Sequence, residues 1–177
     1  MFNRIIQRVI RIIKLDVPVY NEIEADEEAT QEAWWIVIVT SLLAALGAGI
    51  AASAIPEARV GFFGPFVASL VSGVIGWLLW SAVTWLIGTR LFQGQATYWE
   101  LARTLGYASA PRILGVLAII PCLGTIAGLV GAVLSLIAGF FAVREALDLT
   151  TEKAIFTILI GWAIVFVLSL LFGNILF

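Results

Sequence analysis

The chain has 177 residues, of which 62% are hydrophobic and 12% are charged, and its formal net charge is −2. A soluble domain is about half apolar and about a quarter charged, so this chain would expose too much apolar surface to stay in water. The composition excludes an ordinary soluble domain, and the small net charge gives no reason to expect nucleic-acid binding. It predicts an all-α, polytopic membrane protein. The sequence has no His and a single Cys, and we expect no metal site and no cofactor.

Residues 1–15 predict a cationic amphipathic helix. At 100° per residue, the apolar and polar side chains of this segment fall on opposite sides of a helix. Such a helix lies in the headgroup region of a bilayer and does not cross it. We expect its basic side chains to contact anionic lipid headgroups, and these side chains are Arg4, Arg8, Arg11 and Lys14. The alternative is an ordinary helix that packs on a partner protein.

Residues 16–33 form an acidic segment, with no basic residue between Leu15 and Trp34. Like charge would hold such a segment away from an anionic membrane, which predicts a solvated linker. The alternative is a docking strip for a basic partner.

Residues 34–177 are predicted to form the transmembrane domain. A span needs about 20 mostly apolar residues, and three stretches meet this requirement directly: 34–54, 66–88 and 154–173. The uncharged stretch 113–143 is too long for one span, and Pro121 and Gly124 favour a turn within it. Two more spans are therefore predicted, at about 101–120 and 123–143.

The placement of basic residues predicts the topology. Cytoplasmic loops carry the excess of Lys and Arg. Five spans with a cytoplasmic N-terminus place nine of the ten basic residues inside and leave only Arg59 outside, whereas four spans give seven inside and three outside. We therefore predict five spans, with the N-terminus in the cytoplasm and the C-terminus outside.

The fourth predicted span is rich in small residues at four-residue spacing. Helices in lipid associate by close backbone approach across such faces. The face serves packing within the monomer or a seam between two copies, and its members are Gly124, Gly128, Gly131, Ser135 and Gly139.

The third predicted span carries the one candidate charge at membrane depth. Thr97 and Glu100 form a capping box that predicts the start of a helix. Pro111 predicts a kink, and Arg112 follows it. A charge at that depth is costly, which makes it a candidate functional residue. The alternatives are that Arg112 reaches the inner interface or forms an ion pair with Glu100 or Glu145.

No set of catalytic residues is visible. Without His, a Ser or Cys nucleophile lacks its usual base. We therefore expect a protein that is not an enzyme.

Four short motifs carry a family resemblance: Gly-Tyr-Ala-Ser-Ala-Pro-Arg at 106–112, Ile-Pro-Cys-Leu-Gly at 120–124, Ala-Val-Arg-Glu-Ala-Leu at 142–147 and Thr-Thr-Glu-Lys-Ala-Ile at 150–155. They resemble the Yip/Yif family (Ypt-interacting proteins, with the Yip domain) in its short prokaryotic form. The residues that match the family's motifs are Gly106, Tyr107, Pro111, Arg112, Pro121, Gly124, Arg144 and Glu145.

The resemblance implies a five-span bundle with a cytoplasmic N-terminus. Eukaryotic members of the family associate with Rab-type GTPases, and with one another, in vesicle traffic. This chain lacks the Asp-Leu-Tyr-Gly-Pro element that precedes their first span, which counts against GTPase binding and favours a prokaryotic cytoplasmic membrane.

Together these features predict a non-enzymatic integral membrane protein that organises lipids or membrane protein partners, other copies of itself included. One alternative is a small transporter or channel with Arg112 in the path of an anion. Another is an accessory subunit of a larger membrane complex.

Overall fold

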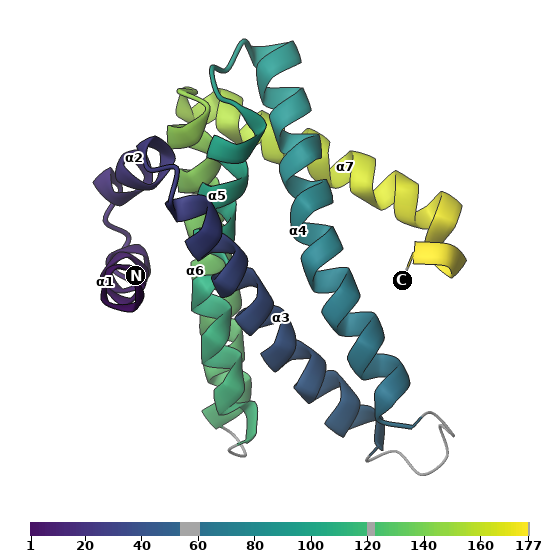
Figure 1. The fold of residues 1–177 in the computed structure, drawn as a ribbon. Helices are drawn as coiled ribbons and strands as arrows, with labels where there is room; N and C mark the ends of the chain where they lie inside the picture. Colours follow the sequence, from purple (N-terminus) through teal and green to yellow (C-terminus); the bar gives the residue numbers. More distant parts are fainter. Residues whose placement is uncertain (54–60, 120–122, 177) are drawn as a thin grey trace.

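The computed structural model describes residues 1–53, 61–119 and 123–176, and the regular structure in these ranges is entirely helical (Figure 1). The helices in chain order are α1 (Phe2–Ile13), α2 (Pro18–Ala25), α3 (Ala29–Ser53), α4 (Phe63–Phe92), α5 (Tyr98–Ala108), the 3₁₀ helix η2 (Ala110–Ile119), α6 (Leu123–Ala146) and α7 (Thr151–Leu176).

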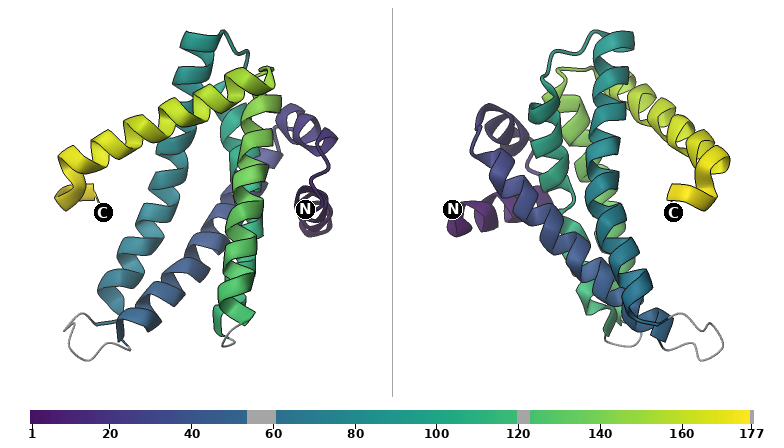
Figure 2. Two further views of the ribbon diagram at one scale, coloured as in Figure 1. Left: turned by 180° about the vertical axis from the view of Figure 1, so that it is seen from behind. Right: turned by 45° about the vertical axis from the view of Figure 1, so that its right-hand side comes forward.

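Three long helices, α3, α4 and α6, extend from one end of the molecule toward the other (Figure 1). α3 and α4 meet at one end and diverge toward the other, as all three views show (Figures 1 and 2). α5 and η2 lie along α6, and α7 leaves the end where α4 finishes and runs at an angle to α4 (Figure 2). α1 and α2 lie at one side of the bundle, on the side opposite the free end of α7 (Figure 1).

Three of the described helical segments are long and apolar enough to cross a membrane: Ala29–Ser53, Phe63–Phe92 and Ile126–Ala146. They coincide with the spans predicted at 34–54, 66–88 and 123–143. α7 covers the residues of the span predicted at 154–173. The chain is therefore an all-helical protein with several membrane-spanning helices.

The segment predicted as the third span is two helices rather than one. α5 ends at Ala108, and η2 continues the path from Ala110 to Ile119. Pro111 has no N–H to donate and its ring collides with the preceding turn, so a regular α-helix is kinked or broken at this position. The N–H of Arg112 instead donates to the carbonyl of Ser109 at 3.0 Å, a spacing typical of a 3₁₀ helix.

α5 occupies the most enclosed position among the described helices. Every residue from Leu101 to Ala108 is buried, whereas α6 exposes large apolar side chains such as Leu129 and Leu136. α5 packs against α2, α3, α4 and α6, whereas α6 has one face against α5 and η2 and another face open.

Small residues allow the closest helix approaches. A Cβ atom on Gly106 of α5 would lie 2.8 Å from the Cβ atom of Ala33 on α3. A Cβ atom on Gly131 of α6 would lie 2.7 Å from the carbonyl oxygen of Pro111. Real Cβ atoms do not come this close to their neighbours, so both positions require glycine at the observed backbone separation.

Leu147, after the end of α6, joins that helix to α4. A Cβ atom on Gly88 would lie 2.5 Å from the Leu147 side chain, and the N–H of Gln95 donates to the carbonyl of Leu147 at 3.2 Å. The start of α7 also contributes, because Lys153 donates to the carbonyl of Phe92 at 3.4 Å. One end of the bundle is therefore held together by the Leu147 side chain and by hydrogen bonds to two backbone carbonyls.

Residues 16–33, for which the acidic composition predicts a solvated linker, contain α2 and the first turn of α3. Val19, Tyr20 and Ile23 of α2 are fully buried against the bundle. Their spacing places them on one face of the short helix, and the surrounding carboxylates obscure this apolar face in the composition.

Candidate functional site

Three arginines of α1 face the acidic segment. Arg4, Arg8 and Arg11 are spaced four and three residues apart, so they form one stripe on the helix. We call this stripe and its partners the arginine–carboxylate cluster. The partners are Asp16, Glu22, Asp26, Glu28 and Glu32.

Glu32, in the first turn of α3, is the centre of the cluster. Its side chain is fully buried, and its two oxygens accept hydrogen bonds from Arg4 Nε at 2.7 Å and from an Arg8 guanidinium nitrogen at 2.9 Å. The hydroxyl of Tyr107 on α5 also donates to Glu32. A buried carboxylate is tolerated only when it is paired and hydrogen-bonded, and three donors from two helices meet that requirement here.

The outer ion pairs surround this centre. Arg8 also bonds Asp26 at 2.7 Å, and Arg4 bonds Glu28 at 2.7 Å. Arg11 forms a bidentate ion pair with Glu22, with hydrogen bonds of 2.6 and 2.8 Å, and donates a further hydrogen bond of 2.6 Å to Asp16. Planar guanidinium groups suit such paired contacts with carboxylates. The stripe therefore holds α1 against the segment that follows it.

The pKa values of two of these carboxylates, Glu22 and Asp26, reflect this pairing. The hydrogen bonds from Arg11 lower the pKa of Glu22. Burial opposes the ionisation of Asp26, but the hydrogen bond from Arg8 and the nearby positive charge outweigh it and lower the pKa of that carboxyl. Both groups are therefore ionised near neutral pH.

Glu24 on α2 behaves differently. Burial, together with the negative charges of Asp148 and Glu100, raises its pKa to about 7. The carbonyl of the same residue accepts a hydrogen bond of 2.6 Å from Arg103, whose side chain is almost fully buried on α5. Glu24 therefore changes its charge near neutral pH at the contact between α2 and α5.

With its arginines turned toward the carboxylates, α1 presents an apolar stripe on its exposed surface. Phe2 is 73% exposed, Ile6 is 56% exposed and Ile10 is 45% exposed. Ile12, on the neighbouring side of the helix, is fully buried in the core. The apolar side of α1 is thus divided between the protein core and the surroundings.

Of the four predicted headgroup contacts, three are engaged within the chain. Arg4, Arg8 and Arg11 meet carboxylates, while Lys14 is exposed. Headgroup contact by these residues stays a prediction. The sequence did contain a signal for the cluster, because a stripe of three arginines is followed by a segment with seven carboxylates. Only the fold shows that the basic partner of the acidic segment is α1 of the same chain.

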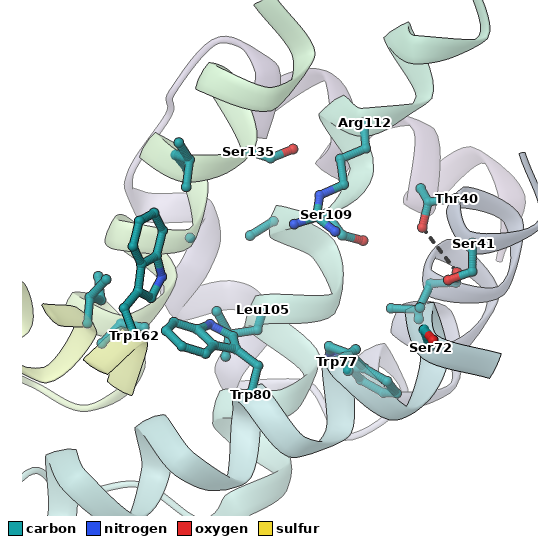
Figure 3. Close-up of a pocket in the computed structure, with 18 residues that line it drawn as sticks. Thr40, Ser41, Ser72, Trp77, Trp80, Leu105, Ser109, Arg112, Ser135 and Trp162 are labelled. Atoms are coloured by element: carbon teal, nitrogen blue, oxygen red, sulfur yellow. Dashed lines mark hydrogen bonds between the residues drawn. The ribbon is translucent and has the colours of Figure 1, made fainter. Parts of the chain in front are cut away.

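Arg112 lies in a different place, at a cavity of about 310 Å³ that is lined by α3, α4, α5, η2, α6 and α7, and its side chain is exposed there. In Figure 3 its side chain extends from η2 past Ser109 into the cavity, with Ser135 on the facing α6. Neither proposed partner binds it: Glu145 pairs with Arg144, and Glu100 caps the start of α5 by accepting from the N–H of Thr97 at 2.7 Å.

The family-motif residues serve several structural roles. Gly106 allows α5 to approach α3, Tyr107 donates to Glu32, and Pro111 contacts Gly131. Arg144 and Glu145 pair with each other, and the guanidinium of Arg144 lies 5.1 Å from the ring centre of Phe141. Pro121 lies outside the described residues.

The residues of the predicted packing face of α6 also differ in their surroundings. Gly131 makes a close contact, and Ser135 lines the cavity. A Cβ atom on Gly128 or Gly139 would meet nothing within 4 Å, and Gly139 lies on the cavity wall. Gly124 is the second residue of α6.

The long apolar helices and the buried polar contacts between them define an all-helical integral membrane protein with several spans. The family model of the Yip1 domain matches residues 17–173, so the chain belongs to the Yip1 domain family. The match begins after α1, so the family does not account for that helix. No curated protein and no solved structure matches the chain.

Proposed function

We propose that this chain is a non-enzymatic membrane protein that organises lipids or membrane protein partners at the cytoplasmic surface. The observation that carries the proposal is the orientation of α1. Its arginines are turned inward to carboxylates, and Phe2, Ile6 and Ile10 are exposed. An exposed apolar stripe on a helix at the edge of a membrane domain is suited to the boundary between headgroups and acyl chains.

The distribution of basic residues, which predicts five crossings with a cytoplasmic N-terminus, supports this placement. The basic residues of the inner segments then lie on the same side as α1, at the end of the bundle where Leu147 and Gln95 are joined. In this arrangement Lys14, which follows α1 and is exposed, can approach anionic headgroups. The arginines hold the helix to the bundle, and the apolar stripe contacts lipid or the apolar face of a partner.

Spin labels on the full-length protein in lipid nanodiscs test the proposal. In a Cys122→Ser background, we would place a label at Ile6→Cys and a matched label at Gln7→Cys, one residue away on the polar side of α1. We expect the label at residue 6 to be relaxed by oxygen, which concentrates in lipid, and the label at residue 7 by a water-soluble nickel complex. Equal exposure of both labels to the nickel complex would contradict the proposal.

The nature of the lipid contact is tested by the composition of the nanodisc. If the apolar stripe supplies most of the contact, replacing anionic lipid by neutral lipid changes the depth of the residue 6 label only slightly. A label that leaves the membrane in neutral lipid would instead assign the contact to the cationic side chains, as the sequence analysis predicts.

A further inference from the structure

The cavity that contains Arg112 has an unbalanced charge. Among the described residues that line it, Arg112 is the one charged side chain, and the rest are apolar or carry hydroxyl groups. The cavity lies between α3, α4 and α6, which are the helices able to cross a membrane. Arg112 is itself exposed on the open side of the cavity, where the surroundings of a membrane-spanning bundle are hydrocarbon. A guanidinium in hydrocarbon is costly when nothing neutralises it.

A second polar group in the cavity also lacks a partner. Ser135 on α6 is 8% exposed, and its hydroxyl oxygen is buried without a hydrogen bond to any described residue. An unsatisfied buried hydroxyl costs about 1–3 kcal/mol. A water molecule would satisfy Ser135 but would leave the charge of Arg112 uncompensated. An anion that accepts from both groups would satisfy both requirements.

The side chains that line the cavity indicate which class of anion it can bind. Guanidinium and hydroxyl groups both donate, and oxyanions such as phosphate accept several hydrogen bonds from a planar guanidinium. The N–H of Trp77 is already bonded to the carbonyl of Ala102 at 2.9 Å, so this indole offers the cavity an apolar ring. Trp80 and Trp162 add further aromatic surface, as Figure 3 shows. Arg112 and Ser135 can therefore bind an oxyanion, which is either free or attached to an apolar group that packs against the aromatic wall.

We propose that this cavity binds one phosphate-type oxyanion, with Arg112 as its charge partner and Ser135 as a hydrogen-bond donor. The group is supplied by the headgroup of an anionic phospholipid or by free phosphate. The site does not depend on α1, so the lipid contact proposed for that helix and this binding site can fail separately.

The test uses the full-length protein in a phosphate-free maltoside detergent. Phosphatidylglycerol is added in one arm and bound lipid is counted by native mass spectrometry, while inorganic phosphate is titrated by calorimetry in the other. Arg112→Gln removes the charge. Gly139→Leu fills the cavity and leaves Arg112 in place. Gly128→Leu is the matched control, because residue 128 has the same open surroundings on α6 but does not line the cavity.

We expect the wild-type protein to bind one equivalent, and we expect Arg112→Gln and Gly139→Leu each to weaken binding about tenfold or more, as for loss of a charged hydrogen-bonding partner. Gly128→Leu should stay within about twofold of the wild type, and Arg112→Lys should restore part of the affinity. Saturable binding in the lipid arm alone identifies a headgroup, and binding in the phosphate arm identifies a free anion.

Two results would overturn the proposal. One is no saturable binding in either arm. The other is binding that is equal in Arg112→Gln, Gly139→Leu and the control, because such binding takes place on the outer surface of the helices. Each folded variant is recognised by an unchanged elution volume and circular dichroism spectrum, and Gly139→Leu supplies the answer if the Arg112 variant does not fold.

Discussion

Glu32 connects three parts of the chain through one carboxylate. It belongs to α3, accepts from two arginines of α1, and receives the hydroxyl of Tyr107 on α5. The Gly-Tyr motif that marks the family therefore has a structural partner at the start of the first long helix. The position of α1 depends on this carboxylate more than on the exposed pairs, because exposed pairs contribute little.

Replacing Glu32 tests this role directly. Glu32→Gln keeps the shape of the side chain but leaves two guanidinium groups without their buried counter-charge, so we expect docking of α1 to weaken by about 2–3 kcal/mol. Amide hydrogen exchange in α1 and α2 measures the change. Glu27→Gln is the control, because Glu27 is exposed in the same segment. Equal exchange in the two variants would contradict the central role of Glu32.

Two buried tyrosines offer a matched comparison. The hydroxyl of Tyr107 donates to Glu32, whereas the hydroxyl of Tyr20 is buried with no partner in the part of the chain that the structure describes. We expect Tyr107→Phe to destabilise the docked segment by about 1–3 kcal/mol, and Tyr20→Phe to be neutral or stabilising. Thermal unfolding in detergent, read together with exchange in α2, distinguishes the two. A larger loss from Tyr20→Phe would show that the assigned hydrogen bond is not the important one.

At the scale of elements, the contact between α2 and α5 should depend on pH. Glu24 has a pKa of about 7 when α2 is docked, above its ordinary value of 4.5. The docked state therefore holds more protons between these two values, so its stability is fully present below about pH 4.5 and is lost as the pH rises through 7. Hydrogen bonds from Arg11 and Arg8 lower the pKa values of Glu22 and Asp26, so these two carboxylates do not titrate in this range.

Exchange of the α2 amides between pH 5 and pH 8, corrected for the intrinsic rate, measures this effect. We expect protection to fall as the pH rises in the wild type and to stay constant in Glu24→Gln. Glu22→Gln serves as the control, and it should keep the dependence on pH. A pH profile that is the same in Glu24→Gln and in the wild type would assign the titration to another group.

The approach of α5 to α3 depends on a single glycine. In Gly106→Ala the new methyl group would meet Ala33 at 2.8 Å, so the two helices must separate. We expect a loss of about 1–3 kcal/mol, in the usual range for overpacking. Gly128→Ala is the control on α6, where the added methyl group meets nothing within 4 Å. Thermal unfolding in detergent compares them, and equal melting temperatures would contradict the close packing.

Individual elements differ in how far the sequence could predict them. The capping box of Thr97 and Glu100 is present as expected, with both hydrogen bonds formed. Pro111 indicated an interruption, but a local pattern cannot distinguish a kink from a change to a 3₁₀ helix, because the outcome depends on how η2 packs against α6. The same limit applies to α2, whose three buried side chains are too few to stand out among carboxylates.

At the scale of the whole molecule, topology is the property that the sequence predicts and that experiment must decide. In intact cells, a membrane-impermeant maleimide should label Cys122 from outside. In a Cys122→Ser background, Gln95→Cys should react only after the membrane is permeabilised. If Cys122 and the cysteine at position 95 both react from the same side of the membrane, the five-span topology is excluded.

Membership of the family and the membrane character of the chain were predictable, because motifs and apolar length are local properties. The partners of the charged residues were not. Composition suggested that Arg4 and Arg8 face lipid and that the carboxylates face water, but helix packing brings the two sets together. The cavity at Arg112 was equally hidden, since its walls come from residues as distant in sequence as Ser41 and Ser135.

The three arginines of α1 differ in exposure, and this determines how the docking of α1 responds to ionic strength. The side chain of Arg8 is 11% exposed, while those of Arg11 and Arg4 are 34% and 40% exposed. At physiological salt, mobile ions screen exposed charges beyond about 8 Å and affect enclosed charges much less. Added salt should therefore loosen the two ends of α1 before its middle, so that the helix pivots about Arg8 instead of detaching in one step.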